Sequence, residues 1–354
     1  SVSNVQASIG GADDRSPVID YALNRGVNFF DTSPGYWKGN HATMLGKIMK
    51  SRGKEMVVTT KLGIRDKKAD AQSYVERFNK HLAEQLQSDY VDFLYIHSPA
   101  TVEDLKNEAF HAAFRQLKAE GKVRFLGISC HGPDPITICR ALIDDGRFDC
   151  VLLSYNFSAD IIHYRKYTGW PELKGVVKEI AAKNIGLVAM KIQAGAWGEK
   201  LIEKQDYSKE SIQTSMRWVY QDTSVTCPIV SVGTFESIDN MVEIALNPRM
   251  TDADHDRIER YMASIHGRRC PIPCPAPCRE ACPHNVPVND AQRSRMYYES
   301  YGRVDDARES YAGLVDPEAP VPCDSCTDRP CGDVCPNGIN IARLMNHTHR
   351  ILTA

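Results

Sequence analysis

The stretch Val91-Asp92-Phe93-Leu94-Tyr95-Ile96-His97 is an apolar run, rich in β-branched and aromatic residues, that ends in one ionisable side chain. Its length and composition are typical of a buried strand. Seven further runs of this kind precede or follow it, and amphipathic stretches separate them. The predicted strands are residues 5–9, 27–30, 56–60, 91–96, 123–128, 150–154, 187–190 and 228–231. Eight β–α units over about 250 residues predict an α/β fold, the (β/α)8 TIM barrel.

Helical periodicity fills much of the sequence between these strands and continues after the last one. The clearest predicted helices are residues 71–86, 102–120, 208–220, 236–246, 252–264, 290–312 and 341–352. Proline and cysteine become dense after residue 265. We therefore expect two domains, a barrel over residues 1–265 and a C-terminal α-helical, ferredoxin-like domain over residues 266–354.

Ionisable side chains stand at the carboxyl ends of three predicted strands. Asp31, Lys61 and His97 each follow an apolar run, and the loop after Asp31 carries Tyr36. Catalytic groups of a barrel sit at the carboxyl ends of its strands, so we expect these four to converge. A Lys ammonium would lower the pKa of a nearby phenol, whose ordinary value is about 10. The set could protonate a carbonyl oxygen while hydride reaches the carbon. The alternative is that Asp31 and Lys61 only form a buried ion pair.

Eight of the twelve cysteines lie in the last 85 residues, in two groups of four. The groups are Cys270, Cys274, Cys278 and Cys282, and Cys323, Cys326, Cys331 and Cys335. A shift of 53 residues carries three members of the first group onto the second, and each group closes with Cys-Pro. This is an internal duplication of a metal-binding unit. The closing Cys-Pro is typical of the ferredoxin run that holds [4Fe–4S] clusters.

Two [4Fe–4S] clusters are therefore expected in the tail. In two-cluster ferredoxins the fourth cysteine of one run serves the other cluster. Cys335 would then join Cys270, Cys274 and Cys278, and Cys282 would join Cys323, Cys326 and Cys331. Zinc bound by the same thiolates and a set of four disulfides are the alternatives. The scattered Cys130, Cys139, Cys150 and Cys227 stand in apolar surroundings and are expected to be reduced core residues.

The stretch Phe29-Phe30-Asp31-Thr32-Ser33-Pro34-Gly35-Tyr36 resembles the aldo-keto reductase signature, as do Thr59-Thr60-Lys61 and residues 89–97. The resemblance continues through residues 121–129 and 154–156 and covers residues 5–265. The cysteine-rich tail is similar to a family branch with a ferredoxin-like [4Fe–4S] extension. The resemblance implies an oxidoreductase that interconverts a carbonyl (an aldehyde, ketone or sugar) and an alcohol. It implies a catalytic tetrad of Asp31, Tyr36, Lys61 and His97, with Tyr36 as general acid.

The resemblance also implies an NAD(P)H cofactor bound at the later strand ends. The candidate contacts are Ser129, Asn156, Lys191, Gly233 and Thr234. Two positions depart from the family pattern. The Ser-Asn pair after the fifth strand reads Ser129-Cys130, followed by His131, and the Gln of the sixth strand reads Leu152. Residues 231–239 contain Glu236 and Asp239 but no cation, so we expect NADH to be favoured over NADPH, whose 2′-phosphate needs cationic donors.

Composition narrows the class of protein. The net charge is −2 and the pI about 6.6, and no basic tract indicates a nucleic-acid partner. No apolar run is long enough to span a bilayer. We expect a small-molecule carbonyl or alcohol substrate, a redox partner protein and a cytoplasmic location; the alternative location follows export by a cleaved twin-arginine signal.

Two rival functions stay open. One is an electron-transfer or assembly subunit whose barrel is a binding module, and the other a reductase fed by clusters without a nicotinamide.

Overall fold

The computed structural model describes residues 6–9, 13–64, 66, 68–130, 134–159, 171–194, 209–265, 267–270, 274, 276–299, 302–316, 318–319 and 321–354. The predictions made for His131 and for the strand and helix starts at Val5 and Ser208 lie outside these residues. The chain divides into two compact units. The barrel unit comprises Ser1–Ser154, Glu172–Ile192 and Met216–Arg249, and the helical unit comprises Tyr155–Pro171, Gln193–Ser215 and Met250–Ala354. The domain boundary at residue 265 stays a prediction.

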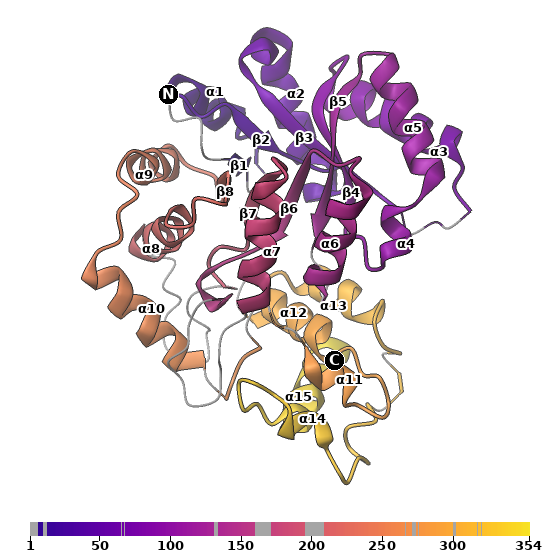
Figure 1. Ribbon diagram of the computed structural model, residues 1–354, viewed down its shortest axis with the longest axis vertical. Coiled ribbons are helices and arrows are strands. Elements are labelled where there is room, and N and C mark those ends of the chain that lie inside the picture. The colour runs from indigo at the N-terminus through magenta and orange to yellow at the C-terminus, as the bar shows by residue number, and fades with distance from the viewer. Residues whose placement is uncertain are drawn as a thin grey trace. The chain divides into compact units, whose positions relative to one another are not determined.

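Eight parallel strands close into a barrel in chain order (Figure 1). They are β1 (Gln6–Ile9), β2 (Phe29–Asp31), β3 (Val57–Gly63), β4 (Val91–His97), β5 (Val123–Cys130), β6 (Cys150–Ser154), β7 (Gly186–Met190) and β8 (Cys227–Val232). Pairing of β1 with both β2 and β8 closes the sheet. The predicted (β/α)8 barrel is confirmed. Strand β3 runs past Thr60 to Gly63, so Lys61 belongs to the strand and does not open the following loop.

Helices alternate with these strands along the barrel. They are α1 (Ser16–Asn24), α2 (Asn40–Arg52), α3 (Ala71–His81), α4 (Val102–Leu105), α5 (Glu108–Ala119), α6 (Pro135–Asp145), α7 (Pro171–Ala182), α8 (Lys209–Tyr220) and α9 (Phe235–Leu246). The described residues also contain the short helical turns η1 (Tyr36–Gly39), η2 (Gly53–Glu55), η3 (Leu82–Leu86) and η4 (Phe157–Ala159). Among the described residues, no helix has the length and apolar character that a membrane crossing requires.

Three predicted helices differ in detail. The single helix expected over residues 102–120 is wrong: the Asn107 side chain accepts from the Phe110 N–H at 3.0 Å and starts α5 as a separate helix. The helix expected over residues 290–312 is also two, α12 (Val288–Glu299) and α13 (Val304–Ala312). Gly302 lies between them with φ 66°, a left-handed conformation that a helix does not continue through. Helix α3 passes into the π-helical turn η3 after His81.

The inside of the barrel is a packed core below a polar rim. Side chains alternate across a strand, so every second residue of each strand faces the lumen. The lumen is filled by Tyr95, Cys150, Leu152, Val188, Met190 and Cys227, with Phe29, Phe93 and Ile229 against them. Gly127 makes room for Tyr95, because a Cβ at residue 127 would meet the Tyr95 ring at 2.5 Å. Cys130, Cys139, Cys150 and Cys227 are all buried and free.

The duplication of the cysteine groups is also present in the structure of the helical unit. Its remaining helices are α10 (Asp252–Ile265), α11 (Pro277–Glu280), α14 (Pro330–Asp333) and α15 (Ile341–Thr353). A shift of 53 residues carries the start of α11 onto that of α14 and the start of α12 onto that of α15. Ala276 and Arg329, which have a positive φ just before α11 and α14, are also related by the shift of 53 residues. Gln292 donates to its own counterpart, Met345, at 3.5 Å, so the two repeats meet at equivalent positions.

Candidate active site and cysteine sites

Asp31 and Lys61 form a buried pair on neighbouring strands. The two residues are only 2% and 1% exposed. Lys61 Nζ donates to Asp31 Oδ1 and, at 2.9 Å, to the backbone oxygen of Thr32. Burial opposes the charged form of Lys61, but the Asp31 carboxylate and the Tyr36 hydroxyl outweigh it and raise the pKa of Lys61. Lys61 therefore remains an ammonium at neutral pH.

Tyr36 and His97 complete the group of four predicted residues. Tyr36 starts η1 just after β2, and its ring centroid lies 4.9 Å from Lys61 Nζ. The Tyr36 and His97 ring centroids are 6.4 Å apart and nearly perpendicular. Both residues are half-buried. The structure thus brings Asp31, Tyr36, Lys61 and His97 together at the carboxyl ends of β2, β3 and β4.

A left-handed turn follows Tyr36 directly. Trp37 and Lys38 have φ of 50° and 54°, and Gly39 has φ of 93°. This conformation costs a non-glycine residue roughly 1–2 kcal/mol, and such residues cluster at functional sites. The turn brings the chain to the start of α2 at Asn40 and leaves Trp37 41% exposed beside Tyr36.

His41 is a second histidine beside Tyr36. It is 1% exposed, its Nδ1 lies 2.9 Å from Thr32 Oγ1, and its ring stands edge-on to Tyr36 at 5.7 Å. Burial, and then the charge of Lys61, lower the pKa of His41 to about 4. His41 is therefore neutral at pH 7, and it contacts Tyr36 of the group of four and the neighbouring Thr32.

Thr59 and Gln6 support Asp31 from inside the barrel. Thr59 Oγ1 donates to Asp31 Oδ1 at 2.6 Å and accepts from Gln6 Nε2 at 3.2 Å. Gln6, Thr32, His41 and Thr59 were not among the site residues predicted from the sequence. Strand alternation could have found Thr59, which lies two residues before Lys61 and therefore shares its face.

The predicted cofactor contacts lie at several places. Ser129 is fully buried on β5, in register with His97 on β4. Lys191 follows β7 with φ 55° and is half-buried. Asn156 belongs to the helical unit, where its side-chain oxygen accepts from the Ser158 N–H at 3.0 Å and hydroxyl at 2.7 Å. Leu152 is part of the apolar lumen.

Gly233 and Thr234 form the N-terminal cap of α9. Thr234 Oγ1 accepts from the Ser237 N–H at 3.1 Å, and the Ser237 hydroxyl accepts from the N–H groups of Gly233 and Thr234 at 3.1 and 3.0 Å. Arg15 Nη1 donates to the Gly233 carbonyl at 2.7 Å. This cation at the loop was missed in the sequence because Arg15 is 218 positions away from Gly233.

The charge of Asp239 on α9 is compensated. Its carboxylate accepts from Arg25 Nε at 2.8 Å and from the Tyr21 hydroxyl at 2.9 Å. The Tyr21 ring lies 4.9 Å from that of Phe235, which is 50% exposed. Two arginines of the first β–α segment thus offset the acidic character of residues 231–239.

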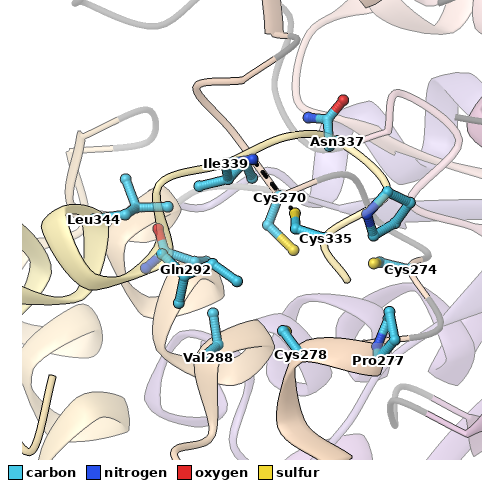
Figure 2. A pocket seen from close by; sticks show the side chains of 12 residues that line it. Cys270, Cys274, Pro277, Cys278, Val288, Gln292, Cys335, Asn337, Ile339 and Leu344 are labelled. Carbon is cyan, nitrogen blue, oxygen red and sulfur yellow. Dashed lines mark hydrogen bonds between the residues drawn. The ribbon is translucent and has the colours of Figure 1, made fainter. Parts of the chain in front are cut away.

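Four cysteines from both repeats line one small hollow (Figure 2). They are Cys270, Cys274, Cys278 and Cys335. The hollow holds about 340 Å³ of space free of atoms, part of it open to solvent. Three donors point at its sulfurs: the Ala276 N–H at Cys274 Sγ (3.4 Å), the Ile339 N–H at Cys335 Sγ (3.5 Å) and Asn289 Nδ2 at Cys270 Sγ (3.6 Å). Donors aimed at sulfur stabilise thiolates, the form that binds metal.

The other four cysteines are also neighbours. Burial and then the nearby Cys282, Cys331 and Cys326 raise the pKa of Cys323 to about 11. The fourth cysteine of each sequence group therefore lies with the first three of the other group. Crowded thiols of this kind lose their protons readily only when a metal supplies positive charge. Within the described parts of the chain, no three His, Cys, Asp or Glu side chains are close enough to hold a single metal ion.

Comparison with known proteins identifies the barrel. Residues 11–211 match the profile described as "Aldo/keto reductase family". L-galactose dehydrogenase of Arabidopsis thaliana is 35% identical over 151 residues, which are 40% of this chain and 46% of that protein. NADH-specific methylglyoxal reductase of Escherichia coli (strain K12) is 31% identical over 163 residues, 40% of this chain and 49% of that one. The chain thus spans less than half the length of these curated relatives.

Solved structures share the fold at low identity. The aldo-keto reductase AKR11C1 from Bacillus halodurans superimposes with a TM-score of 0.55 and 19% identity, over 73% of this chain and 91% of that one. An aldo-keto reductase from Klebsiella pneumoniae in complex with NADPH gives a TM-score of 0.56 and 16% identity, over 73% and 90%. At this identity the likeness shows the barrel fold.

Proposed function

Because the chain belongs to the aldo/keto reductase family, we propose that it is an oxidoreductase that interconverts a carbonyl compound and an alcohol. The observation that carries the proposal is the buried Asp31–Lys61 pair with Tyr36 and His97 beside it. Relatives named for a sugar and for methylglyoxal favour a small polar carbonyl, such as an aldose or a short oxoaldehyde.

Tyr36 is the general acid of this proposal. The Lys61 ammonium, 4.9 Å from the ring centroid, makes it easier for Tyr36 to release its proton, and Asp31 keeps Lys61 charged and in place. His97 would hold the carbonyl oxygen by a hydrogen bond. In reduction the carbonyl oxygen takes the Tyr36 proton and the carbon takes a hydride. In oxidation the phenolate takes the proton back.

A nicotinamide cofactor would supply or accept that hydride. Ser129, Lys191 and the cap residues Gly233 and Thr234 are the contacts we propose, and all four lie in the barrel unit. Asn156, the fifth contact expected from the sequence, belongs to the helical unit. We propose NADH as the preferred form, since Glu236 at the start of α9 would repel a 2′-phosphate. Arg15 works against that preference because it brings a cation to Gly233. Titrating NADH and NADPH against the anaerobic protein decides between them, and tighter NADPH binding would refute the charge argument.

The eight tail cysteines would hold two [4Fe–4S] clusters. The crossed grouping, with Cys335 beside the first three cysteines and Cys282 beside the last group, supports this ligand division. Zinc bound by the same thiolates is the alternative, and it differs from the clusters in bringing no inorganic sulfide. The clusters would exchange electrons with a redox partner protein or brace the helical unit.

Metal analysis tests the clusters. We expect about eight irons and eight acid-labile sulfides per chain, as two cubanes require. The anaerobic protein should show the broad visible absorption of [4Fe–4S] clusters and, after reduction, their EPR signals. Zinc without sulfide in the purified protein would contradict the assignment.

Tyr36→Phe tests the carbonyl chemistry. We expect reduction of a panel of aldoses and oxoaldehydes to fall by about 10² to 10⁴, the usual contribution of a positioned general acid, with the fold intact. Tyr90→Phe is the matched control, because it removes a hydroxyl that donates only locally, to the Gly53 carbonyl at 3.1 Å. Equal turnover in the wild type and the Tyr36 variant would show that the chemistry lies elsewhere.

A second candidate is a reductase that takes its electrons from the clusters and uses no nicotinamide. The presence of Leu152 in the apolar lumen, at the position of the family's Gln, and the engagement of the Asn156 oxygen by Ser158 favour it. The third candidate is an electron-transfer or assembly subunit whose barrel is a binding module. Failure of both nicotinamides to bind, combined with turnover driven by a chemical one-electron reductant, would support the cluster-fed reaction.

A further inference from the structure

Thr59 and Thr60 are neighbours on β3 with opposite surroundings. Both are fully buried. Thr59 faces the lumen and contacts Asp31, its register partner on β2. Thr60 faces the outer side, where its hydroxyl lies 2.8 Å from His81 Nε2 on α3. The chain thus offers two threonines alike in burial and strand position, of which one touches the candidate active site.

The lumen hydroxyl belongs to a directed chain of hydrogen bonds. Gln6 Nε2 donates to Thr59 Oγ1 at 3.2 Å, so the Thr59 proton points onward to Asp31 Oδ1 at 2.6 Å. Lys61 Nζ donates to the same carboxylate oxygen from the other side. Asp31 Oδ1 therefore shares its charge between a neutral donor and the ammonium.

Several other titratable groups face Asp31 and Tyr36. Tyr95 lies on β4 below Lys61, with its ring centroid 6.0 Å from Nζ, and burial followed by Cys150 raises its pKa well above the ordinary value. Burial likewise raises the pKa of Cys150 to about 12. His41 from α2 has its pKa lowered to about 4, and the His97 ring lies 6.4 Å from that of Tyr36. Tyr95, Cys150 and His41 are therefore neutral across the range from pH 6 to 9, whereas the Lys61 ammonium lies 4.9 Å from the centroid of the Tyr36 ring.

We infer that Thr59, held by Gln6, is a positioning residue that sets how much of the Lys61 charge Tyr36 experiences. The inference rests on the proposed carbonyl–alcohol function. A hydrogen bond to Asp31 from Thr59 weakens the hold of the carboxylate on Lys61. Without this hydrogen bond, Lys61 is drawn toward Asp31, and the carboxylate balances the charge of the ammonium more completely. Tyr36 then releases its proton less easily.

In Thr59→Val the ionisation of Tyr36 moves to higher pH by about 0.5 to 1 unit. A hydrogen bond to a charged group is worth about 1 to 2 units, and only part of this reaches Tyr36, because Thr59 acts through Asp31 and Lys61. In carbonyl reduction, the alkaline limb of the pH profile moves up and kcat at pH 7 falls by up to roughly 3- to 10-fold, with KM nearly unchanged. In alcohol oxidation the acidic limb, which reports the Tyr36 phenolate, moves up by the same amount.

The experiment compares Thr59→Val with Thr60→Val in the full-length anaerobic protein. Each variant replaces a buried hydroxyl by a methyl group, so general destabilisation is matched. We expect the limb of the pH profile that reports Tyr36 to move to higher pH in Thr59→Val and to keep its wild-type position in Thr60→Val. In Thr59→Ser, which restores the hydroxyl, it should return to the wild-type position. If Thr59→Val does not fold, Thr59→Ala replaces it in the comparison. An unmoved limb in the Thr59 variants, or an equal shift in Thr60→Val, overturns the inference.

A second readout separates this inference from the proposed function. The ionisation of Tyr36 can be followed by NMR of ¹³Cζ-labelled tyrosine, with Tyr36→Phe identifying the resonance. If the wild type reduces no carbonyl compound, the proposed function fails, and the midpoint of this titration still decides the role of Thr59. A midpoint that is higher in Thr59→Val than in the wild type and Thr60→Val supports it; equal midpoints refute it.

Discussion

Lys61 and His41 show how surroundings decide the charge of a buried basic side chain. Both are almost completely buried within the same site. Lys61 contacts a carboxylate and stays charged, whereas the pKa of His41 is lowered by burial and by Lys61. Beside Tyr36 the site therefore holds one fixed positive charge and one neutral ring, an arrangement suited to a phenol that must give up and regain a proton.

His41 also makes stability depend on pH. Its pKa is about 4 in the folded protein against an ordinary 6.5, so the unfolded chain binds the proton more tightly. The stability that His41 contributes is complete above pH 6.5 and is lost as pH falls from 6.5 toward 4, by on the order of 3 kcal/mol at most. Urea unfolding at several pH values should show a shallower acid loss in His41→Gln than in the wild type. Identical slopes would contradict the neutral assignment.

At the scale of elements, the packing of α2 against η3 depends on one glycine. Gly46 lies within α2 where it packs against η3, and a Cβ there would meet the Leu86 carbonyl oxygen at 2.3 Å. Gly175 lies within α7, and a Cβ there meets nothing within 4 Å. Glycine is thus required at residue 46 by a close contact, whereas at residue 175 it only weakens its helix.

The two glycines give a matched prediction. Gly46→Ala should destabilise the protein by about 1–3 kcal/mol, the usual cost of overpacking, because backbone of η3 must move. Gly175→Ala should stabilise it by about 0.5–1 kcal/mol, since alanine is the better helix former. Thermal and urea midpoints of the two variants measure the difference. A stabilised Gly46→Ala would mean that α2 and η3 do not pack as described.

At the scale of the whole molecule, the cysteines belong to one of the two compact units. All eight candidate ligands lie in the helical unit, and each set of four draws on both repeats. A cluster held in this way joins the repeats, so metal binding and folding of this unit should be coupled.

Cys331→Ser should therefore destabilise the helical unit more than the barrel unit. Loss of one thiolate weakens the set of Cys282, Cys323 and Cys326, whereas the barrel keeps its core and its closed sheet. Hydrogen exchange, read separately for peptides of each unit, should rise in residues 277–354 and change little in β3 to β5. Cys139→Ser, at a buried cysteine of α6, is the control that should show the reverse pattern. Equal loss of protection in both units would contradict the prediction.

Local patterns in the sequence were sufficient for the strands, the barrel and the position of the group of four. Apolar runs alternate with helical periodicity, and in a closed parallel barrel the ends of consecutive strands necessarily meet, so Asp31, Lys61 and His97 had to converge. The 53-residue duplication likewise predicted that the two cysteine groups belong to repeated units, although the short helices α11 and α14 within them were not predicted. These features repeat at fixed intervals along the chain, and such intervals can be read without coordinates.

Only the tertiary structure decided which side chains support that site. Thr59 reaches Asp31 across 28 positions of sequence, Gln6 reaches Thr59 across 53, and Arg15 reaches Gly233 across 218. Threonine, glutamine and arginine are common residues whose types do not specify a partner. Their contacts arise because closing the sheet brings β1, β2, β3 and β8 around one axis, and the distances then follow from strand register and side-chain packing, which no local pattern encodes.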